Sequence, residues 1–143
     1  MTTDDRRRML LQISFVLAVV ATLGSLYFGE VLKYPPCQLC WYQRIAMYPL
    51  VAICGVALWT GDLRFHRYVL PLTFAGFAIA SYHVLLYYGI IPDSITPCSQ
   101  GVSCTTKQIE WLGFITIPLM SWISFLALHL LSAANLLLKE KNA

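Results

Sequence analysis

Four long apolar segments dominate the sequence and limit the folds that it can adopt. They cover approximately residues 9–29, 41–60, 68–90 and 114–138. Each has about 20–25 residues, enough for an α-helix to cross a hydrocarbon layer of about 30 Å. Backbone polar groups in lipid must be satisfied within the segment, so a helix is expected for each. The sequence therefore predicts an all-α membrane protein, a four-helix transmembrane bundle in which residues 1–143 form one integral membrane domain.

The composition agrees with a chain in contact with membrane lipid. Hydrophobic residues make up 58% and charged residues 12%, the latter about half the usual share of a soluble protein. The basic residues form no stripe with interleaved aromatic residues, so nucleic acid is not an expected partner. The first apolar segment is longer than the roughly 7–15 residues of a signal-peptide core, and we interpret it as a retained anchor.

The distribution of Lys and Arg predicts the orientation. The N-terminus holds three, the turn at 61–67 two and the C-terminus two, which sum to seven, whereas the other two connections hold one each. Under the positive-inside rule this imbalance places both termini in the cytoplasm. Both cysteine-bearing connections then face outward, where disulfides can persist.

Two features refine the expected helices. Residues 107–113 mix apolar and charged side chains, which favours a short interfacial helix before the fourth span, with Trp111 at headgroup level. Pro49, Pro71 and Pro118 fall in the first half of their segments, and we expect them to kink the helices without ending them.

The first thiol pair, Cys37 and Cys40, has a C-x-x-C spacing immediately before the second span. Cys40 is expected near a helix N-terminus, where free N–H groups and the helix dipole favour a thiolate, the nucleophile of disulfide exchange. The same spacing suits a structural disulfide or half of a metal site. Arg44 shares a helix face with Cys40, so it can stabilise the thiolate or donate to a polar ligand, and a snorkelling arginine is the alternative. Gln43 is interpreted as interfacial.

The second pair, Cys98 and Cys104, encloses five residues in the longest polar connection. Such a loop disulfide is accessible to the thiolate of another protein, although it can equally be a staple for the loop. Four thiolates suffice for tetrahedral zinc, but the second spacing is loose and the compartment oxidising, so no metal is expected. Cys54 lies about 21 Å beyond Cys40 along a helix, and we interpret it as a buried packing residue.

The three histidines receive different interpretations. His83 lies in the third span about 10 Å below its outer end, where it can flank one pocket with Arg44 or form a hydrogen bond between helices. His129 is interpreted as a hydrogen-bonding residue between helices. His66 falls in the cytoplasmic turn, where we expect it to be solvated.

If the thiols turn over, their electrons need an acceptor. The sequence has no Gly-rich phosphate loop, HExxH motif or nucleophile elbow that would indicate a soluble cofactor or hydrolase domain. A lipid-soluble quinone suits a small bundle, because it accepts the two electrons and two protons that one dithiol releases. Menaquinone or ubiquinone is therefore the expected cofactor.

One stretch resembles the C-x-x-C…Arg signature of the DsbB thiol:quinone oxidoreductases, namely Cys37-Gln38-Leu39-Cys40-Trp41-Tyr42-Gln43-Arg44. The resemblance covers nearly the whole chain: four spans, both termini inside, a C-x-x-C motif before the second span and another cysteine pair before the fourth. The short spacing of that pair is most similar to the BdbC-type branch of Gram-positive bacteria. The resemblance implies a multi-pass protein of a bacterial cytoplasmic membrane that generates protein disulfides.

The resemblance also implies site residues. A reduced thioredoxin-like oxidase outside the membrane, similar to DsbA or BdbD, would attack the Cys98–Cys104 disulfide at Cys98. Cys104 would then exchange with Cys37 and leave Cys40 beside the quinone. Arg44 would polarise the quinone or steady the sulfur, and His83 is carried over as a further quinone-binding residue.

Two other functions fit the same residues. One is a vitamin K epoxide reductase-like enzyme, in which the C-x-x-C motif on the quinone side resembles a motif of the last span. In this chain the C-x-x-C motif precedes the second span, which argues against this function. The other is a non-enzymatic membrane protein with two structural disulfides. Structural disulfides would resist a mild reductant, whereas catalytic disulfides exchange with it readily. A small transporter is disfavoured because paired intramembrane charges and broken inverted repeats are not found in the sequence.

Overall fold

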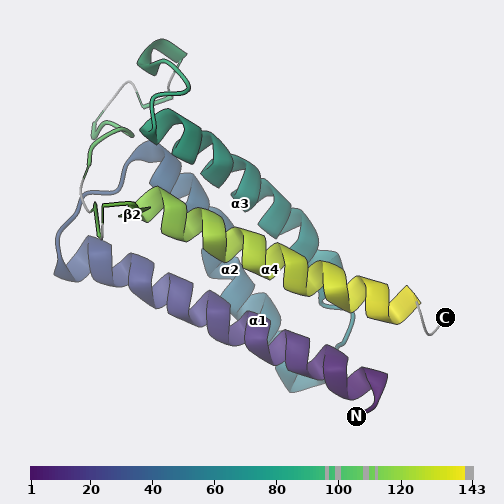
Figure 1. Ribbon diagram of the computed structural model, residues 1–143. Helices are drawn as coiled ribbons and strands as arrows, with labels where there is room; N and C mark the ends of the chain where they lie inside the picture. Colours follow the sequence, from purple (N-terminus) through teal and green to yellow (C-terminus); the bar gives the residue numbers. More distant parts are fainter. Residues whose placement is uncertain (96, 99–100, 108–109, 112, 141–143) are drawn as a thin grey trace.

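Four long helices form the body of the molecule, and the N- and C-termini lie at the same end (Figure 1). The computed structural model describes residues 1–95, 97–98, 101–107, 110–111 and 113–140. The helices are α1 (Thr3–Leu26), α2 (Gln38–Thr60), α3 (His66–Tyr87) and α4 (Ile117–Glu140). All four are long and apolar enough to cross a membrane, so the predicted all-α, four-helix fold class is confirmed.

Local sequence signals account for several helix boundaries. A capping box begins α1, because Thr2 accepts from the Asp5 N–H while the Asp5 carboxylate accepts from the Thr2 N–H. The chain then continues from α1 into a π-helix, η1 (Tyr27–Val31). Pro118 is the second residue of α4, where a missing N–H breaks no intrahelical bond, so the kink predicted at this residue is wrong.

The connection between α3 and α4 contains three short elements. They are a 3₁₀ turn, η2 (Asp93–Ile95), and two antiparallel strands, β1 (Glu110–Trp111) and β2 (Ile115–Thr116). The interfacial helix predicted over 107–113 is therefore wrong for the residues that the structure describes there. Aromatic and β-branched residue types favour strand pairing, and Trp111 pairs with Ile115. Residues 108–109 and 112 and the side chain of Trp111 lie outside the described part.

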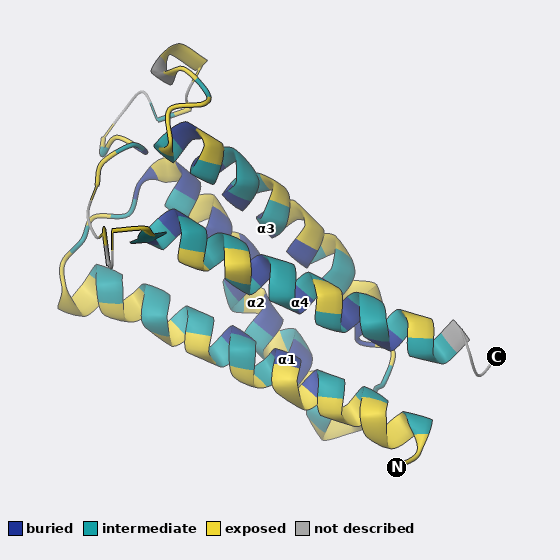
Figure 2. Cartoon of the chain, in the orientation of Figure 1, coloured by how far each residue is buried: buried dark blue, intermediate teal, exposed yellow. Residues whose placement is uncertain are grey.

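Each helix packs mainly against two others, in the cyclic order α1, α2, α3, α4. Figure 2 shows buried residues along the inward faces and exposed residues along the outward faces. The apolar core includes Phe65, Leu50, Phe125 and Leu128. Cys54 belongs to the same core and is 0% exposed, which confirms its interpretation as a packing residue.

Polar contacts join α3 and α4 within this core. The Thr73 hydroxyl lies 3.1 Å from His129 Nδ1, so the predicted role of His129 between helices is confirmed. His66 is 2% exposed, and its Nδ1 lies 2.8 Å from Asn135 Oδ1. The prediction that His66 is solvated is therefore wrong, because α3 begins at this residue and turns its ring towards α4.

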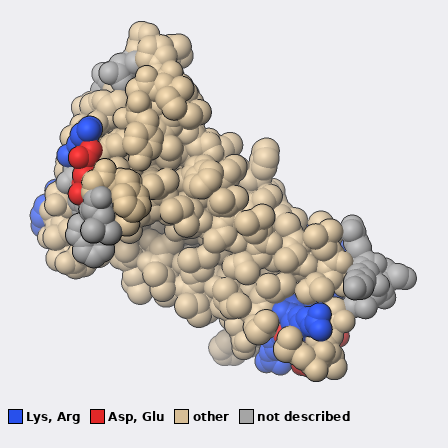
Figure 3. All heavy atoms as spheres, viewed as in Figure 1, with Lys and Arg blue, Asp and Glu red and all other residues tan. Residues whose placement is uncertain are grey.

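Charged side chains are confined to the two ends of the molecular face shown in Figure 3, with a long uncharged band between them. At one end, Arg7 donates to the Leu63 carbonyl at 2.7 Å and pairs with Asp4 at 3.6 Å. At the other, Lys107 pairs with Glu110 at 2.9 Å. This division matches a bundle whose middle lies in hydrocarbon.

Gly76 allows α3 and α4 to approach closely. A Cβ atom at this position would overlap the Phe125 ring. Small residues at helix contacts let backbones approach in membrane proteins, where dispersion forces rather than water exclusion favour association.

We expect Gly76→Ala to lower the free energy of unfolding by about 1–3 kcal/mol, because the buried Phe125 ring has to move. The measurement is denaturant-induced unfolding of purified protein in detergent micelles. Gly24→Ala is the matched control, since a Cβ there meets nothing within 4 Å. Equal stability of the two variants would contradict the close contact.

Candidate active site

Cys37 is the N-cap residue of α2 and places its sulfur over the first turn. Its Sγ accepts a hydrogen bond from the Cys40 N–H at 3.3 Å. The two sulfurs are 2.9 Å apart, whereas a disulfide bond is about 2.05 Å long. Both residues are therefore free thiols in this structure. From the sequence we expected the helix N-terminus to favour a thiolate at Cys40. The structure instead places the Cys37 sulfur at the N-cap position.

Cys37 lies just outside the spanning part of α2, and its thiol is strongly acidified. The hydrogen bond from the Cys40 thiol is the main cause that lowers the pKa of Cys37 to about 4. Burial opposes this effect, and a contact with His83 supports it. This direction makes Cys37 the more acidic thiol of the reduced pair.

Cys98 and Cys104 form a disulfide, with their Cα atoms 6.0 Å apart. The two sulfurs differ in access, because Cys104 is 4% exposed while Cys98 is only half-buried. An incoming thiolate therefore reaches Cys98 more easily than Cys104.

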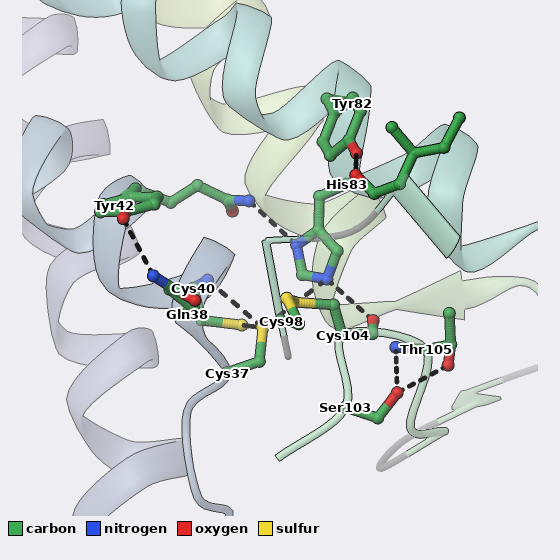
Figure 4. Close-up of a disulfide and its surroundings, with 12 residues drawn as sticks. Cys37, Gln38, Cys40, Tyr42, Tyr82, His83, Cys98, Ser103, Cys104 and Thr105 are labelled. Atoms are coloured by element: carbon green, nitrogen blue, oxygen red, sulfur yellow. Dashed lines mark hydrogen bonds between the residues drawn. A yellow bond between two sulfur atoms is a disulfide. The ribbon is translucent and has the colours of Figure 1, made fainter. Parts of the chain in front are cut away.

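The two cysteine pairs, which are far apart in the sequence, meet at one end of the bundle (Figure 4). Cys37 and Cys104 belong to one buried cluster, against which Cys40 and Cys98 pack. A cavity of about 30 Å³ lies between the pairs and is lined by Cys37, Cys40, Cys104 and His83, among others. That volume is enough for a water molecule. The arrangement brings the sulfurs of one pair close to the disulfide of the other.

His83 lies at the centre of this cluster and is 2% exposed. Its Nδ1 is 3.0 Å from the Gln43 amide nitrogen, and its Nε2 is 3.2 Å from the Cys104 carbonyl oxygen. A carbonyl can only accept, so Nε2 carries a hydrogen and Nδ1 accepts from Gln43. The same Nε2 lies 3.9 Å from the Cys37 sulfur. Gln43 thus orients a ring that faces both cysteine pairs.

A second, larger cavity of about 280 Å³ lies between α1, α2 and α4. Cys40, Gln43 and Arg44 line it on the α2 side. The remaining lining residues are mostly apolar: Leu17, Val20, Ala21, Gly24, Ser25, Phe28, Gly29, Tyr34, Pro36, Met47, Tyr48, Ile117, Met120, Ser121 and Ser124. An apolar cavity with a few convergent polar groups is typical of small-molecule sites.

Arg44 is held in place by α1. Its Nε donates to the Ser25 hydroxyl and its Nη2 to the Ser25 carbonyl, both at 3.0 Å. Its guanidinium also lies 5.4 Å from the centre of the Trp41 ring. Gly29, in η1, leaves the space for it, since a Cβ there would be 2.7 Å from Nη2. These contacts fix a positive charge at the wall of the larger cavity.

The structure therefore brings together Cys37, Cys40, Cys104 and His83, with Cys98 beside them. Arg44 and His83 line different cavities, so they do not flank one pocket as the sequence suggested. Gln43, interpreted as interfacial, is 6% exposed and lines the larger cavity. Gln43 lies three residues after Cys40, so both share one helix face, and this spacing could have indicated that Gln43 belongs to the site.

Comparison with known proteins gives one consistent result. The model of the family described as "Disulfide bond formation protein DsbB" matches residues 7–135. The chain is similar to "Disulfide bond formation protein C" of Bacillus subtilis (strain 168), with 48% identity over 120 residues, covering 84% of this chain and 87% of the relative.

Two further relatives are similar over most of their length. "Probable disulfide formation protein C 2" of Bacillus anthracis is 40% identical over 137 residues, covering 95% of this chain and 96% of the relative. "Probable disulfide formation protein" of Metapseudomonas resinovorans is 39% identical over 123 residues, 85% of each chain. No solved structure gives a significant match.

The acidity of Cys37 leads to a prediction for its alkylation. With a pKa of about 4, Cys37 remains a thiolate above that pH, so its rate of reaction with iodoacetamide should be nearly constant between about pH 5 and 8. In Cys40→Ala the main hydrogen bond is lost, the pKa rises, and the rate should climb steeply over the same range. Mass spectrometry of the reduced, pulse-labelled protein gives these rates. A steep profile in the unmodified protein would contradict the assignment.

Proposed function

The chain belongs to the DsbB family of disulfide bond formation proteins, and we propose that it reoxidises an extracytoplasmic thioredoxin-like thiol oxidase and passes the electrons to a membrane quinone. Family membership implies a disulfide-forming oxidoreductase of a multi-pass membrane type. The partner, the acceptor and the residue roles are the proposal. One observation carries it: Cys40 lines both the cavity between the cysteine pairs and the cavity beside Arg44.

Electrons enter at the Cys98–Cys104 disulfide. The thiolate of the reduced partner attacks Cys98, the more accessible sulfur, so a partner–Cys98 bond forms and Cys104 leaves as a thiolate. The second thiol of the partner then displaces Cys98, which releases the oxidised partner. Two electrons and two protons now reside on Cys98 and Cys104.

The inner pair takes over these electrons. When Cys37 and Cys40 form a disulfide, the Cys104 thiolate attacks Cys37, with which it shares the small cavity, and Cys40 leaves. Closure of Cys98 onto Cys104 then frees Cys37. The outcome is a disulfide at 98–104 with two thiols at 37 and 40, which is the pairing found in the structure.

The larger cavity fits a quinone head group. Its volume of about 280 Å³ is close to the lower end of the usual range for ligand sites, about 300–1,000 Å³, and its wall is largely apolar. A bound quinone supplies an acceptor for the two electrons and two protons of one dithiol. Cys40 lies against this space, and Arg44 directs a fixed positive charge towards it. Of the two cavities described here, His83 lines the smaller one, so its proposed part is to orient and polarise Cys37 rather than to touch the acceptor.

The proposed orientation places both termini in the cytoplasm and both cysteine pairs outside a bacterial cytoplasmic membrane. Seven of the Lys and Arg residues lie in the terminal segments and the 61–67 turn, which supports this assignment. It also exposes Cys98 to the compartment in which disulfides form.

We expect Cys40→Ser to reduce quinone turnover to the uncatalysed rate, because the remaining thiol at Cys37 cannot form the inner disulfide. The assay mixes purified protein, a reduced thioredoxin-like partner and quinone without oxygen, and follows quinone absorbance. Cys54→Ala, which changes a thiol in the core, should retain turnover. Normal turnover by Cys40→Ser would rule out the mechanism.

Arg44→Ala should raise the apparent KM for quinone by roughly 10–100-fold, since a charge-assisted hydrogen bond contributes about 1.5–3 kcal/mol. The KM for the reduced partner should change much less, because Arg44 does not line the cavity between the cysteine pairs. Arg67→Ala, an exposed arginine at the opposite end of the bundle, is the control for loss of charge. An effect on the partner KM alone would remove Arg44 from the quinone site.

A further inference from the structure

Three side chains at the outer ends of α2 and α3 have the chemistry of a metal site. The ligand atoms of Cys37, Cys40 and His83 all lie within 4.8 Å of one another. We propose that the reduced Cys37–Cys40 pair and His83 bind a thiophilic divalent cation such as Zn²⁺, and that this metal blocks turnover. The site uses residues of the proposed function, but metal binding itself requires neither quinone nor partner.

The sulfur–nitrogen distance is close to that of tetrahedral zinc, whereas the sulfur–sulfur distance is shorter than zinc requires. Bond lengths of about 2.3 Å to sulfur and 2.0 Å to nitrogen require about 3.8 Å between sulfurs and about 3.5 Å between sulfur and nitrogen. The sulfurs are 2.9 Å apart, and Cys37 Sγ lies 3.9 Å from His83 Nε2. Rotation of the half-buried Cys40 side chain can open the sulfur–sulfur distance while α2 and α3 keep their positions.

The donor set selects the type of cation. Two thiolates neutralise a divalent charge, and together with an imidazole they favour zinc and similar soft ions over Mg²⁺ or Ca²⁺, which prefer oxygen. Cys37 is 6% and His83 2% exposed, so the ion would be largely shielded from water. The fourth position faces the cavity of about 30 Å³, which has room for a water molecule.

Gln43 can support the metal-bound form of His83. A metal on Nε2 displaces the hydrogen that now points to the Cys104 carbonyl, so Nδ1 must carry the remaining hydrogen and donate. The Gln43 amide is 3.0 Å from Nδ1, and its rotation presents Oε1 as the acceptor. Metal-binding histidines usually have such a partner, which fixes the ring.

This site differs from a four-thiolate zinc site, which the loose spacing of the second cysteine pair disfavours. Here Cys98 and Cys104 keep their disulfide, and only the inner pair must be reduced. Binding converts two thiols and one cation into a dithiolate complex and releases up to two protons, and no electrons move. Because both sulfurs are then engaged, the pair cannot close to a disulfide. The metal thus traps the enzyme with its inner pair reduced, after the pair has received electrons and before it can pass them to an acceptor.

The test uses the full chain in detergent with Cys54→Ala, Cys98→Ser and Cys104→Ser, so that only the two inner thiols remain. After anaerobic reduction and removal of the reductant, the protein is titrated with Co²⁺ and then with Zn²⁺. We expect one Co²⁺ per chain, a thiolate-to-cobalt charge-transfer band, displacement by Zn²⁺, and no such band after the pair is oxidised.

His83→Ala in the same background should weaken Co²⁺ binding by more than about 100-fold, and Gln43→Leu by roughly 10–100-fold, the usual effect of losing the partner that orients a ligand. X-ray absorption of the Zn²⁺ complex should show two sulfur ligands and one imidazole nitrogen. This measurement decides the matter even if a His83 variant does not fold. Unchanged affinity in a folded His83→Ala, a shell without imidazole, or equal binding by oxidised protein would each overturn the proposal.

Inhibition is tested separately on the unmodified chain. Zn²⁺ should stop quinone reduction by the reduced partner, and a chelator should restore it. Failure of turnover without metal would refute the proposed function while leaving the Co²⁺ titration valid. Binding of Co²⁺ without inhibition by Zn²⁺ would refute the blocking role.

Discussion

Hydrocarbon offers the backbone no hydrogen-bond partners, and the rest of this structure depends on that constraint. Each apolar segment has to satisfy its own N–H and C=O groups, so it forms a helix. Four helices joined in sequence alternate in direction, which brings the α1–α2 and α3–α4 connections to the same end of the bundle. Cysteines more than fifty positions apart therefore meet without a soluble domain to organise them. The small cavity between Cys37, Cys40 and Cys104 is a direct result.

The beginning of α2 separates two chemical environments. Cys37 faces the disulfide and His83, whereas Arg44, one turn after Cys40, faces the cavity between α1, α2 and α4. Cys40 and its neighbour Gln43 stand between them, since Cys40 lines both spaces and Gln43 contacts His83 from the wall of the larger one. This division suits the proposed function, in which disulfides are exchanged at the water-facing end of the bundle and electrons pass to an acceptor in the membrane. It also explains why a cation held by the inner pair would interrupt the proposed pathway.

Sequence patterns were most reliable where one physical effect dominates. The apolar runs predicted four helices, and Cys54 and His129 lie in the core and at a helix contact as expected. Two of the predictions that were wrong concern residues near helix ends, where burial depends on the neighbouring element. His66 begins α3 and pairs with Asn135 of α4, and Glu110–Trp111 pairs as a strand with Ile115–Thr116. Asn135 is 69 residues from His66, so periodicity cannot reveal that contact. The two short strands are close in sequence, but each has only two residues, too few for an alternating pattern to show.

The sequence by itself determined the class of fold, the two cysteine pairs and the arginine beside the first of them. These follow from segment length, from C-x-x-C spacing and from the four-residue repeat of a helix face, all of which are local properties. Only the tertiary structure decided that Cys37 rather than Cys40 caps α2, that His83 lies with the cysteines, and that Gln43 is buried against it. The cap is a local contact over three residues. The positions of His83 and Gln43 depend on how α3 and the connection before α4 pack against α2, and contacts between distant segments are not encoded in any local pattern.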